Sequence, residues 1–354
     1  MKKIRVLVVE DSLTVRKRLV EVLAGDPDLE VVAEAPDGQR AIELCQSLRP
    51  DVITLDMMLP LLTGVAVTEY VMAYCPTPIL IVSASTNRGE LFKTYEALAA
   101  GALDVLEKPT ASSVPEEWAR KFISTVKLIS RIKVITHPRA RLMQARLAGG
   151  VPEFPLRGEP SQPRVVAIGA STGGPAAVLA ILRELPASFP LPVLVVIHLG
   201  LPFAAAMAEW LDGQSAIRVR YARDGEPLPK AGVLLAPPGQ HLVLSCGRLR
   251  LTDEPERHSC RPSVDVLFES LAREMGSGCI ACLLTGMGKD GAQGLLAARQ
   301  AGAITVAQNE ASSVVFGMPG EAIRLGAAQR VLSIEEVAPV LVALTNNPKA
   351  GRAS

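Results

Sequence analysis

The stretch Val165-Val166-Ala167-Ile168-Gly169-Ala170-Ser171-Thr172-Gly173-Gly174 decides the fold of the second half of the chain. It begins with a short apolar run, typical of a buried strand, and ends in a glycine-rich turn that carries a serine. A helical pattern over residues 175–185 follows directly. A strand, a turn and a helix in this order indicate an α/β protein, in which reactive groups collect at the carboxyl ends of the strands.

Two more polar residues follow strand-like runs in this half. His198 closes Val193-Leu194-Val195-Val196-Ile197, and Asp290 lies in Leu284-Thr285-Gly286-Met287-Gly288-Lys289-Asp290-Gly291. A serine nucleophile needs an imidazole to accept its proton and a carboxylate to orient that imidazole. We therefore predict a catalytic triad of Ser171, His198 and Asp290. The common α/β-hydrolase sheet has the order Ser, Asp, His, so the G-x-S-x-G turn alone would indicate the wrong fold.

Composition places the chain among ordinary globular proteins. Its 354 residues favour two domains, and 49% hydrophobic with 21% charged residues excludes disordered and fibrous classes. A net charge of +1 provides no field for nucleic acid or an anionic membrane. Six scattered cysteines indicate a reducing compartment. We expect no binding to nucleic acid.

Targeting and membrane signals are also missing from the pattern. The apolar run from Val6 stops at Glu10, which is too short for a secretory signal. The longest stretch free of charged side chains, residues 185–208, is interrupted by four prolines. We therefore expect a cytoplasmic protein without direct membrane insertion.

The first half of the chain alternates strand and helix patterns. This predicts a doubly wound, flavodoxin-like (βα)5 domain with strands over residues 4–9, 29–33, 52–55, 79–82 and 105–106 and a last helix over 116–135. The second half predicts a Rossmann-like, mostly parallel sheet, with a helix over 204–211 and a hairpin turn at Cys246-Gly247. The expected boundaries are a first domain over 1–136, a linker over 137–161, a second domain over 162–346 and a disordered tail over 347–354.

Polar residues end four strands of the first domain. Glu10-Asp11, Asp56, Ser83 and Lys108 each follow an apolar run, so they converge on one pocket. Clustered carboxylates suit Mg²⁺, which prefers oxygen ligands. Asp56 is then a candidate phosphate acceptor, with Ser83 and Lys108 as contacts for the phosphoryl oxygens.

These motifs resemble two known families. The first domain resembles a response-regulator receiver domain, through Val9-Glu10-Asp11-Ser12, Leu55-Asp56-Met57, Val82-Ser83-Ala84 and the run from Gly101 to Pro109. The second resembles the catalytic domain of the chemotaxis protein-glutamate methylesterases. The motifs concerned are Gly169–Gly174, Arg261-Pro262-Ser263-Val264-Asp265-Val266-Leu267-Phe268, Leu284–Gly291 and Val315-Phe316-Gly317-Met318-Pro319.

The resemblance implies a phosphorylation-regulated serine hydrolase in two-component chemosensory signalling. It implies methyl-accepting chemoreceptors as substrates, with demethylation of glutamyl methyl esters and glutamine deamidation, and a sensor histidine kinase as phosphodonor. Thr172 and Met287 become candidate oxyanion donors. Mg²⁺ at the phosphorylation site would be held by Glu10, Asp11, Asp56 and Met58, and no cofactor is implied in the catalytic domain.

One residue and one short stretch depart from the usual receiver pattern. Val105 stands where receivers often have an aromatic residue that switches rotamer, so activation cannot use that ring. The stretch Leu59-Pro60-Leu61-Leu62-Thr63-Gly64 also differs, which should alter the surface beside Asp56 more than its chemistry.

Other interpretations remain open beside the triad. The second domain could be a non-catalytic binding module, or a nucleotide-binding output, because residues 286–291 also match G-x-G-x-x-G with Glu310 at a suitable distance. His241 and His258 lack a metal-ligand partner set and are expected to be exposed loop or strand-end residues. Ser263 is expected to cap the helix that begins near Val264.

Overall fold

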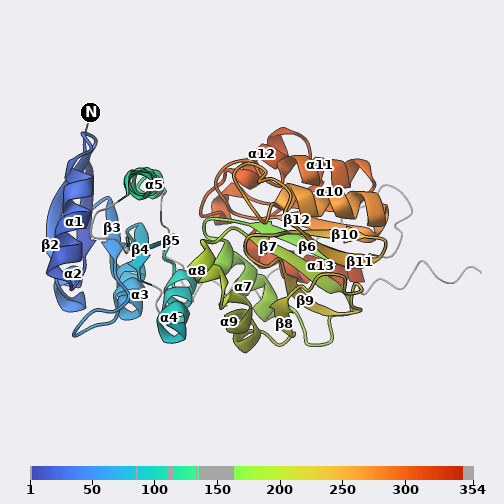
Figure 1. Ribbon diagram of the computed structural model, residues 1–354, viewed down its shortest axis with the longest axis horizontal. Coiled ribbons are helices and arrows are strands. Elements are labelled where there is room, and N and C mark those ends of the chain that lie inside the picture. Colours follow the sequence, from blue (N-terminus) through green and yellow to red (C-terminus); the bar gives the residue numbers. More distant parts are fainter. Residues whose placement is uncertain (1, 85–86, 110–114, 133, 135–162, 346–354) are drawn as a thin grey trace, which may run out of the picture. The chain divides into compact units, whose positions relative to one another are not determined.

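The chain divides into two compact units in a computed structural model (Figure 1). The structure describes residues 2–84, 87–109, 115–132, 134 and 163–345. The division falls between residues 148 and 149, within the expected linker. The linker residues 137–161 and the expected tail 347–354 lie outside the described residues.

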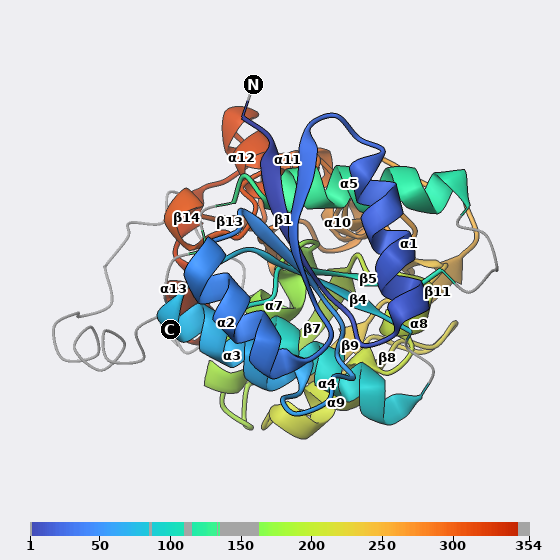
Figure 2. The same cartoon turned by 90° about the vertical axis from the view of Figure 1, so that its left-hand side faces the viewer.

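The first unit is a five-stranded parallel sheet in the order β2-β1-β3-β4-β5, the flavodoxin-like order. Its strands are β1 (Ile4–Val9), β2 (Leu29–Ala35), β3 (Val52–Leu55), β4 (Ile79–Ser83) and β5 (Asp104–Glu107). Its helices are α1 (Leu13–Ala24), α2 (Gly38–Leu48), α3 (Gly64–Tyr74), α4 (Arg88–Ala99) and α5 (Glu116–Ile129). Helices α1 and α5 cover one face, and α2 and α3 cover the other (Figure 2).

Local sequence explains where these helices begin. Ser12, Asp37, Thr63 and Asn87 each accept a backbone N–H of the first turn with the side chain, and thereby cap α1, α2, α3 and α4. Strand β4 extends one residue beyond its expected end, to Ser83, and β5 extends one residue at each end, over Asp104–Glu107. Two further boundaries differ from expectation. Strand β2 continues to Ala35 because it stays paired with β1 up to Val9, and α5 ends at Ile129, earlier than the expected residue 135.

The second unit contains a seven-stranded sheet in the order β14-β13-β12-β6-β7-β9-β8, parallel at every pairing. Its strands are β6 (Val165–Ala170), β7 (Pro192–Ile197), β8 (Val219–Tyr221), β9 (Gly232–Leu235), β12 (Cys279–Leu283), β13 (Ile304–Gln308) and β14 (Arg330–Leu332). Strands β10 (His241–Ser245) and β11 (Arg248–Thr252) form a separate antiparallel hairpin. The predicted turn at Cys246-Gly247 is confirmed.

Helices cover both faces of this sheet, which confirms the doubly wound α/β class. They are α7 (Gly174–Glu184), α8 (Leu201–Ala204), α9 (Met207–Gln214), α10 (Val264–Met275), α11 (Ala292–Gln300), α12 (Met318–Arg324) and α13 (Ile334–Thr345). Helices α10, α11 and α12 pack together on one face, and α7 packs with α9 and α13 on the other (Figure 1). The helix expected over 204–211 is instead divided between α8 and α9. No described helix is long and apolar enough to cross a membrane.

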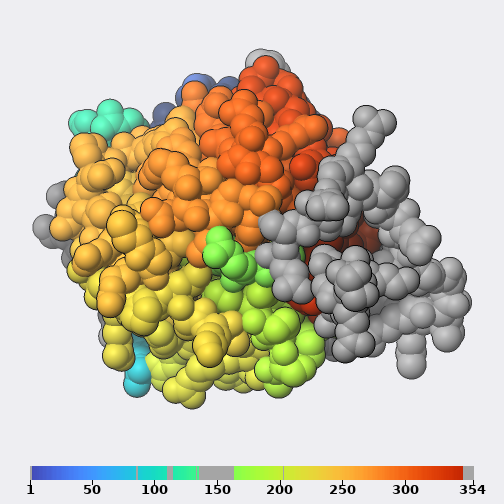
Figure 3. Space-filling view, turned by 90° about the vertical axis from the view of Figure 1, so that its right-hand side faces the viewer, coloured from blue at the N-terminus to red at the C-terminus, as the bar shows by residue number. Residues whose placement is uncertain are grey.

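The position of β6 determines where a site can form. From β6 the chain proceeds through β7 to β9 in one direction and later through β12 to β14 in the other. In Figure 3 the green segments from the start of this unit accordingly lie between the yellow and the orange parts of the chain. Ligands of open α/β sheets bind where the strand order reverses, so the loops after β6 and β12 are the expected place for a site.

Candidate active site and phosphorylation site

Ser171 is the first residue after β6, in the turn that leads into α7. Its N–H donates to the Thr285 carbonyl at 3.0 Å, and its carbonyl accepts the Gly174 N–H at 2.7 Å. The turn requires glycine at 173, where φ is 75° and a Cβ would lie 2.5 Å from the Val314 side chain. The turn therefore fixes the serine at the edge where β6 and β12 end.

The loop after β12 packs directly against Ser171. A Cβ on Gly286 would lie 2.8 Å from the Ser171 Cβ and 2.2 Å from Met318 Sδ, so only glycine allows this approach. The loop thus brings Gly286, the residue before Met287, against the serine. On the other side, the buried Thr172 accepts the Thr285 hydroxyl with its carbonyl at 2.9 Å. The two candidate oxyanion donors thus belong to segments that meet at Ser171.

His198 follows β7, the strand next to β6. Its N–H donates to the Ala170 carbonyl at 3.1 Å, which places it next to the residue before Ser171. On the side chain, Nε2 lies 2.9 Å from Asp290 Oδ2 in a close ion-pair contact. The other ring nitrogen, Nδ1, lies 3.6 Å from the Cys260 Sγ. The structure therefore brings His198 and Asp290 together, and it adds a thiol at the remaining nitrogen.

Asp290 is anchored at the beginning of α10. Its Oδ1 accepts the Ser263 hydroxyl at 2.7 Å and the Asp265 N–H at 3.1 Å, and its Oδ2 accepts the Val264 N–H at 2.7 Å. The free N–H groups of a helix start favour an anion, so this position suits a carboxylate. The carboxylate is buried, with 2% of the residue exposed, and cannot turn toward solvent.

The ionisation of the pair follows from these contacts. Burial acts to lower the pKa of His198, but the hydrogen-bonding contacts with Asp290 and Cys260 outweigh it and raise the pKa to about 9. Burial acts to raise the pKa of Asp290, but His198, Ser263 and the Val264 N–H together lower it below its ordinary value. The contacts favour an imidazolium–carboxylate pair at neutral pH.

Three residues around the triad were not expected to take part. Ser263 caps α10 as predicted, accepting the Val266 N–H, but its hydroxyl also donates to Asp290. Its position in the Arg261–Phe268 motif was the only sequence signal for this contact. Nothing in the sequence pointed to Cys260. The expectation that His241 is exposed is wrong, because this residue is 0% exposed, accepts the Ser263 N–H at Nδ1 and contacts the Pro255 carbonyl through Nε2.

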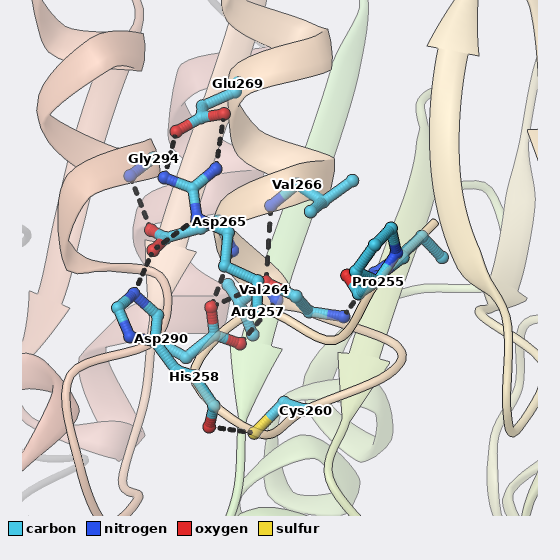
Figure 4. A network of polar contacts seen from close by, with 12 residues as sticks. Pro255, Arg257, His258, Cys260, Val264, Asp265, Val266, Glu269, Asp290 and Gly294 are labelled. Carbon is cyan, nitrogen blue, oxygen red and sulfur yellow. Dashed lines mark hydrogen bonds and ion pairs between the residues drawn. The ribbon is translucent and has the colours of Figure 1, made fainter. Parts of the chain in front are cut away.

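A polar network secures the turn that carries Cys260 (Figure 4). Arg257 lies 2.7 Å from Glu269 of α10 and 3.6 Å from Asp265. His258 Nε2 lies 3.1 Å from Asp265 Oδ2, and Asp265 Oδ1 accepts the Gly294 N–H at 2.6 Å. The turn is thus tied to the same helix start that holds Asp290. His258 is exposed in this loop, as expected.

The alternative of a dinucleotide site is weakened by the same geometry. In the G-x-G-x-x-G stretch, Asp290 points into the protein toward α10 and His198, so the loop is occupied by internal contacts. The loop also follows β12, and the first strand of the unit, β6, leads instead into the Ser171 turn. A dinucleotide fingerprint belongs in the first βα turn.

The first unit gathers its polar residues at the end of β1 and β3. Lys108 Nζ lies 2.8 Å from Glu10 Oε2 and 2.9 Å from Asp56 Oδ2, and the Met57 N–H donates to Asp56 Oδ1 at 2.7 Å. Burial, and then repulsion by Asp56, raises the pKa of Glu10 to about 7. Burial acts to lower the pKa of Lys108, but Asp56 and Glu10 raise it above its ordinary value.

Two features of this pocket fit a metal and a phosphoryl group. One carboxylate oxygen each of Glu10, Asp11 and Asp56 lies within 4.8 Å of the others, a spacing that one Mg²⁺ with ligands at about 2.0 Å can span. Ser83 Oγ is buried and has no hydrogen-bond partner in the part of the chain that the structure describes. Met58 offers Mg²⁺ only its backbone carbonyl, since a thioether is too soft a ligand.

Family models match both units. Residues 6–115 match the response regulator receiver domain, and residues 166–341 match the CheB methylesterase. The fold and these matches define a response regulator whose output domain is a hydrolase.

Similar proteins show which family within this class the chain belongs to. A protein-glutamate methylesterase/protein-glutamine glutaminase of Nitrosospira multiformis is 47% identical, over 97% of this chain and 96% of its own length. One from Anaeromyxobacter dehalogenans is 45% identical over 97% of both chains. The chain belongs to the protein-glutamate methylesterase/protein-glutamine glutaminase family.

Solved structures resemble each unit separately. The Thermotoga maritima CheB methylesterase catalytic domain is 35% identical, with a TM-score of 0.49, covering 52% of this chain and all of that one. The response regulator domain of Thermotoga maritima CheB is also 35% identical, with a TM-score of 0.34, covering 37% of this chain and 99% of that one.

Proposed function

We propose that this protein is a cytoplasmic, phosphorylation-controlled methylesterase that hydrolyses glutamyl methyl esters of chemoreceptors and also deamidates receptor glutamines. The proposal places the receiver at residues 1–136, the linker at 137–161 and the catalytic domain at 162–346. The observation that supports it is the 2.9 Å contact of His198 Nε2 with Asp290, together with the position of Ser171 after β6, the strand between β7 and β12 where the sheet order reverses. The relatives named above have these two activities in their names.

In this mechanism His198 is the general base. Because Nε2 faces Asp290, Nδ1 is the nitrogen that takes the proton of Ser171 as Oγ attacks the ester carbonyl carbon. The oxyanion that forms accepts the backbone N–H groups of Thr172 and Met287. Collapse of this intermediate breaks the carbon–oxygen bond to the methoxy group, which takes the proton from His198 and leaves as methanol.

Water completes the reaction by the same route in reverse. His198 takes a proton from water, the hydroxide attacks the acyl-Ser171 carbonyl, and Ser171 recovers its proton as the glutamate carboxylate leaves. Attack on a glutamine side chain follows identical steps with ammonia as the leaving group. Methanol leaves more readily than ammonia, so ester hydrolysis should be the faster reaction.

In the receiver, Asp56 accepts the phosphoryl group from a sensor histidine kinase. Mg²⁺, held by Glu10, Asp11, Asp56 and the Met58 carbonyl, supplies charge neutralisation between the carboxylates and the phosphoryl oxygens when it is bound. Lys108, which contacts Asp56 directly, and Ser83, whose hydroxyl is free of partners in the described chain, bind phosphoryl oxygens.

Methanol release from a methyl-esterified receptor tests the esterase. We expect phosphodonor-treated wild-type protein to release methanol and Ser171→Ala to release almost none, although it stays folded. The matched control is Ser245→Ala, since Ser245 is an exposed residue at the end of β10. Methanol release by Ser171→Ala near the wild-type rate would refute the serine mechanism. If the wild-type protein were folded but released no methanol, the second domain would be better explained as a binding module.

A further inference from the structure

The position of Cys260 is fixed by the turn that precedes it. It ends a tight turn in which Arg257 and Cys260 exchange backbone hydrogen bonds at 3.2 and 3.0 Å. The two residues between them, His258 and Ser259, have φ of 53° and 59°, a conformation that side-chain-bearing residues rarely adopt. Strained backbone of this kind persists only where the surroundings impose it, and here Arg257 and His258 are tied to α10. The turn holds the thiol against His198.

The spacing of the two side chains matches a metal site. Cys260 Sγ lies 3.6 Å from His198 Nδ1. In a tetrahedral zinc site, Zn–S of about 2.3 Å and Zn–N of about 2.05 Å separate the sulfur from the nitrogen by about 3.6 Å. The two atoms therefore have the separation that two ligands of one zinc ion require.

The contact on the other side of the His198 imidazole provides a second, independent indication of a metal site. A histidine that binds zinc usually donates its other ring N–H to a carboxylate, which fixes the ring and makes the ligating nitrogen more basic. His198 has this arrangement, because Nε2 faces the buried Asp290 while Nδ1 faces the thiol. One ligand atom each of His198, Cys260 and Asp290 lies within 4.8 Å of the others. Cys260 is partly exposed, so an ion has access.

We propose that Cys260 Sγ and His198 Nδ1 form an inhibitory site for a thiophilic divalent cation of the zinc class, with Asp290 behind the imidazole and water completing the shell. Binding releases two protons to solvent, one from the Cys260 thiol and one from Nδ1 of the His198 imidazolium, and the metal takes their place. The nitrogen that must accept the Ser171 proton is then occupied by the metal. The cation switches the hydrolase off without entering the receiver.

Metal binding is tested with Co²⁺, which replaces Zn²⁺ and gives a thiolate-to-metal charge-transfer absorption band only when a cysteine is a ligand. The full-length protein is titrated in excess Mg²⁺, which occupies carboxylate sites, and with a phosphine as reductant. We expect the band in the wild type and in Cys246→Ala, a control that removes the exposed cysteine of the β10–β11 turn, and not in Cys260→Ala. A band that survives in Cys260→Ala, or its absence from the wild type, would overturn the proposal.

Inhibition is tested by the rate at which a serine-directed phosphonate labels Ser171. This part rests on the proposed function, whereas the cobalt band does not, so the two can fail separately. We expect Zn²⁺ to slow labelling of the wild type and of Cys246→Ala, with recovery on adding a chelator. The zinc concentration for half-inhibition should be at least ~10-fold higher in Cys260→Ala, because a direct ligand is lost. Equal zinc sensitivity of Cys260→Ala and the wild type would contradict the assignment. No labelling of zinc-free wild type would instead refute the proposed role of Ser171.

Discussion

The hydroxyl of Ser263 donates to Asp290 Oδ1 at 2.7 Å, while the other carboxylate oxygen lies 2.9 Å from His198 Nε2. The residue that caps α10 therefore also holds the carboxylate of the candidate triad. Ser263, which the sequence predicted only as a helix cap, thus also contacts the carboxylate that faces His198.

Removing this hydroxyl should impair catalysis more than stability. A hydrogen bond to a charged group contributes about 1.5–3 kcal/mol, so Ser263→Ala should lower kcat/KM by about 10- to 100-fold. Loss of the cap should cost about 1 kcal/mol of folding free energy. Ser263→Thr keeps a hydroxyl and should restore most of the activity. If alanine and threonine variants were equally impaired, the hydroxyl would not be the cause.

The candidate triad should behave as one unit. Ser171→Ala and His198→Ala should each lower kcat by at least about 10³-fold, and the double variant should be little worse than either. Asp290→Asn should also be severe, because the amide cannot favour the charged imidazole. Steady-state kinetics on a methyl ester measure these effects. Additive losses in the double variant would show that the two residues act separately.

The pH dependence of hydrolysis should reveal the pKa of His198. The base must be neutral to accept a proton, so kcat/KM should rise with pH, with a midpoint near the raised pKa of about 9, and level off above it. Cys260→Ala removes one of the contacts that raise this pKa and should move the midpoint to lower pH. A midpoint near 6.5 in the wild type would mean that the contacts with Asp290 and Cys260 do not act on His198 in solution.

The same shift predicts a stability effect of definite sign. The folded-state pKa of His198 is raised from 6.5 to about 9, so its contribution to folding is fully present below pH 6.5 and is lost as the pH rises toward 9. The wild type should therefore lose free energy of unfolding relative to His198→Gln as the pH rises over this interval. Chemical denaturation at pH 6 and pH 9.5 measures it. A difference that grows with pH would reverse the sign and contradict the shift.

Phosphorylation of the receiver should need both Asp56 and Mg²⁺. Without the metal, Glu10, Asp11 and Asp56 repel an incoming phosphoryl group, so a small-molecule phosphodonor should add one phosphoryl group only when Mg²⁺ is present. Asp56→Ala should take up none, while Glu43→Gln, which alters an exposed carboxylate on α2, should behave as the wild type. Intact-mass spectrometry measures the uptake. Labelling that is insensitive to a chelator would count against the metal.

The sequence alone determined the two sheets and the places where the candidate site residues lie. Parallel strands covered on both faces consist of continuous apolar runs, and a polar residue that follows such a run must lie at the carboxyl edge. Ser171, His198 and Asp290, like Glu10, Asp56, Ser83 and Lys108, were identified in this way. The helix boundaries were predicted less accurately: α5 ends at Ile129, and the helix expected over 204–211 is divided between α8 and α9.

Only the tertiary structure decided what surrounds these residues. His241 is buried because the Ser263 N–H and the Pro255 carbonyl are available to its ring nitrogens, and both partners are brought there by the folded chain. Cys260 reaches His198 across 62 positions of sequence through a turn held by Arg257 and His258. Contacts between loops depend on how separate strands and helices pack, and hydrophobic periodicity contains no information about them. For that reason, the surroundings that raise the pKa of His198 could be found only in the folded structure.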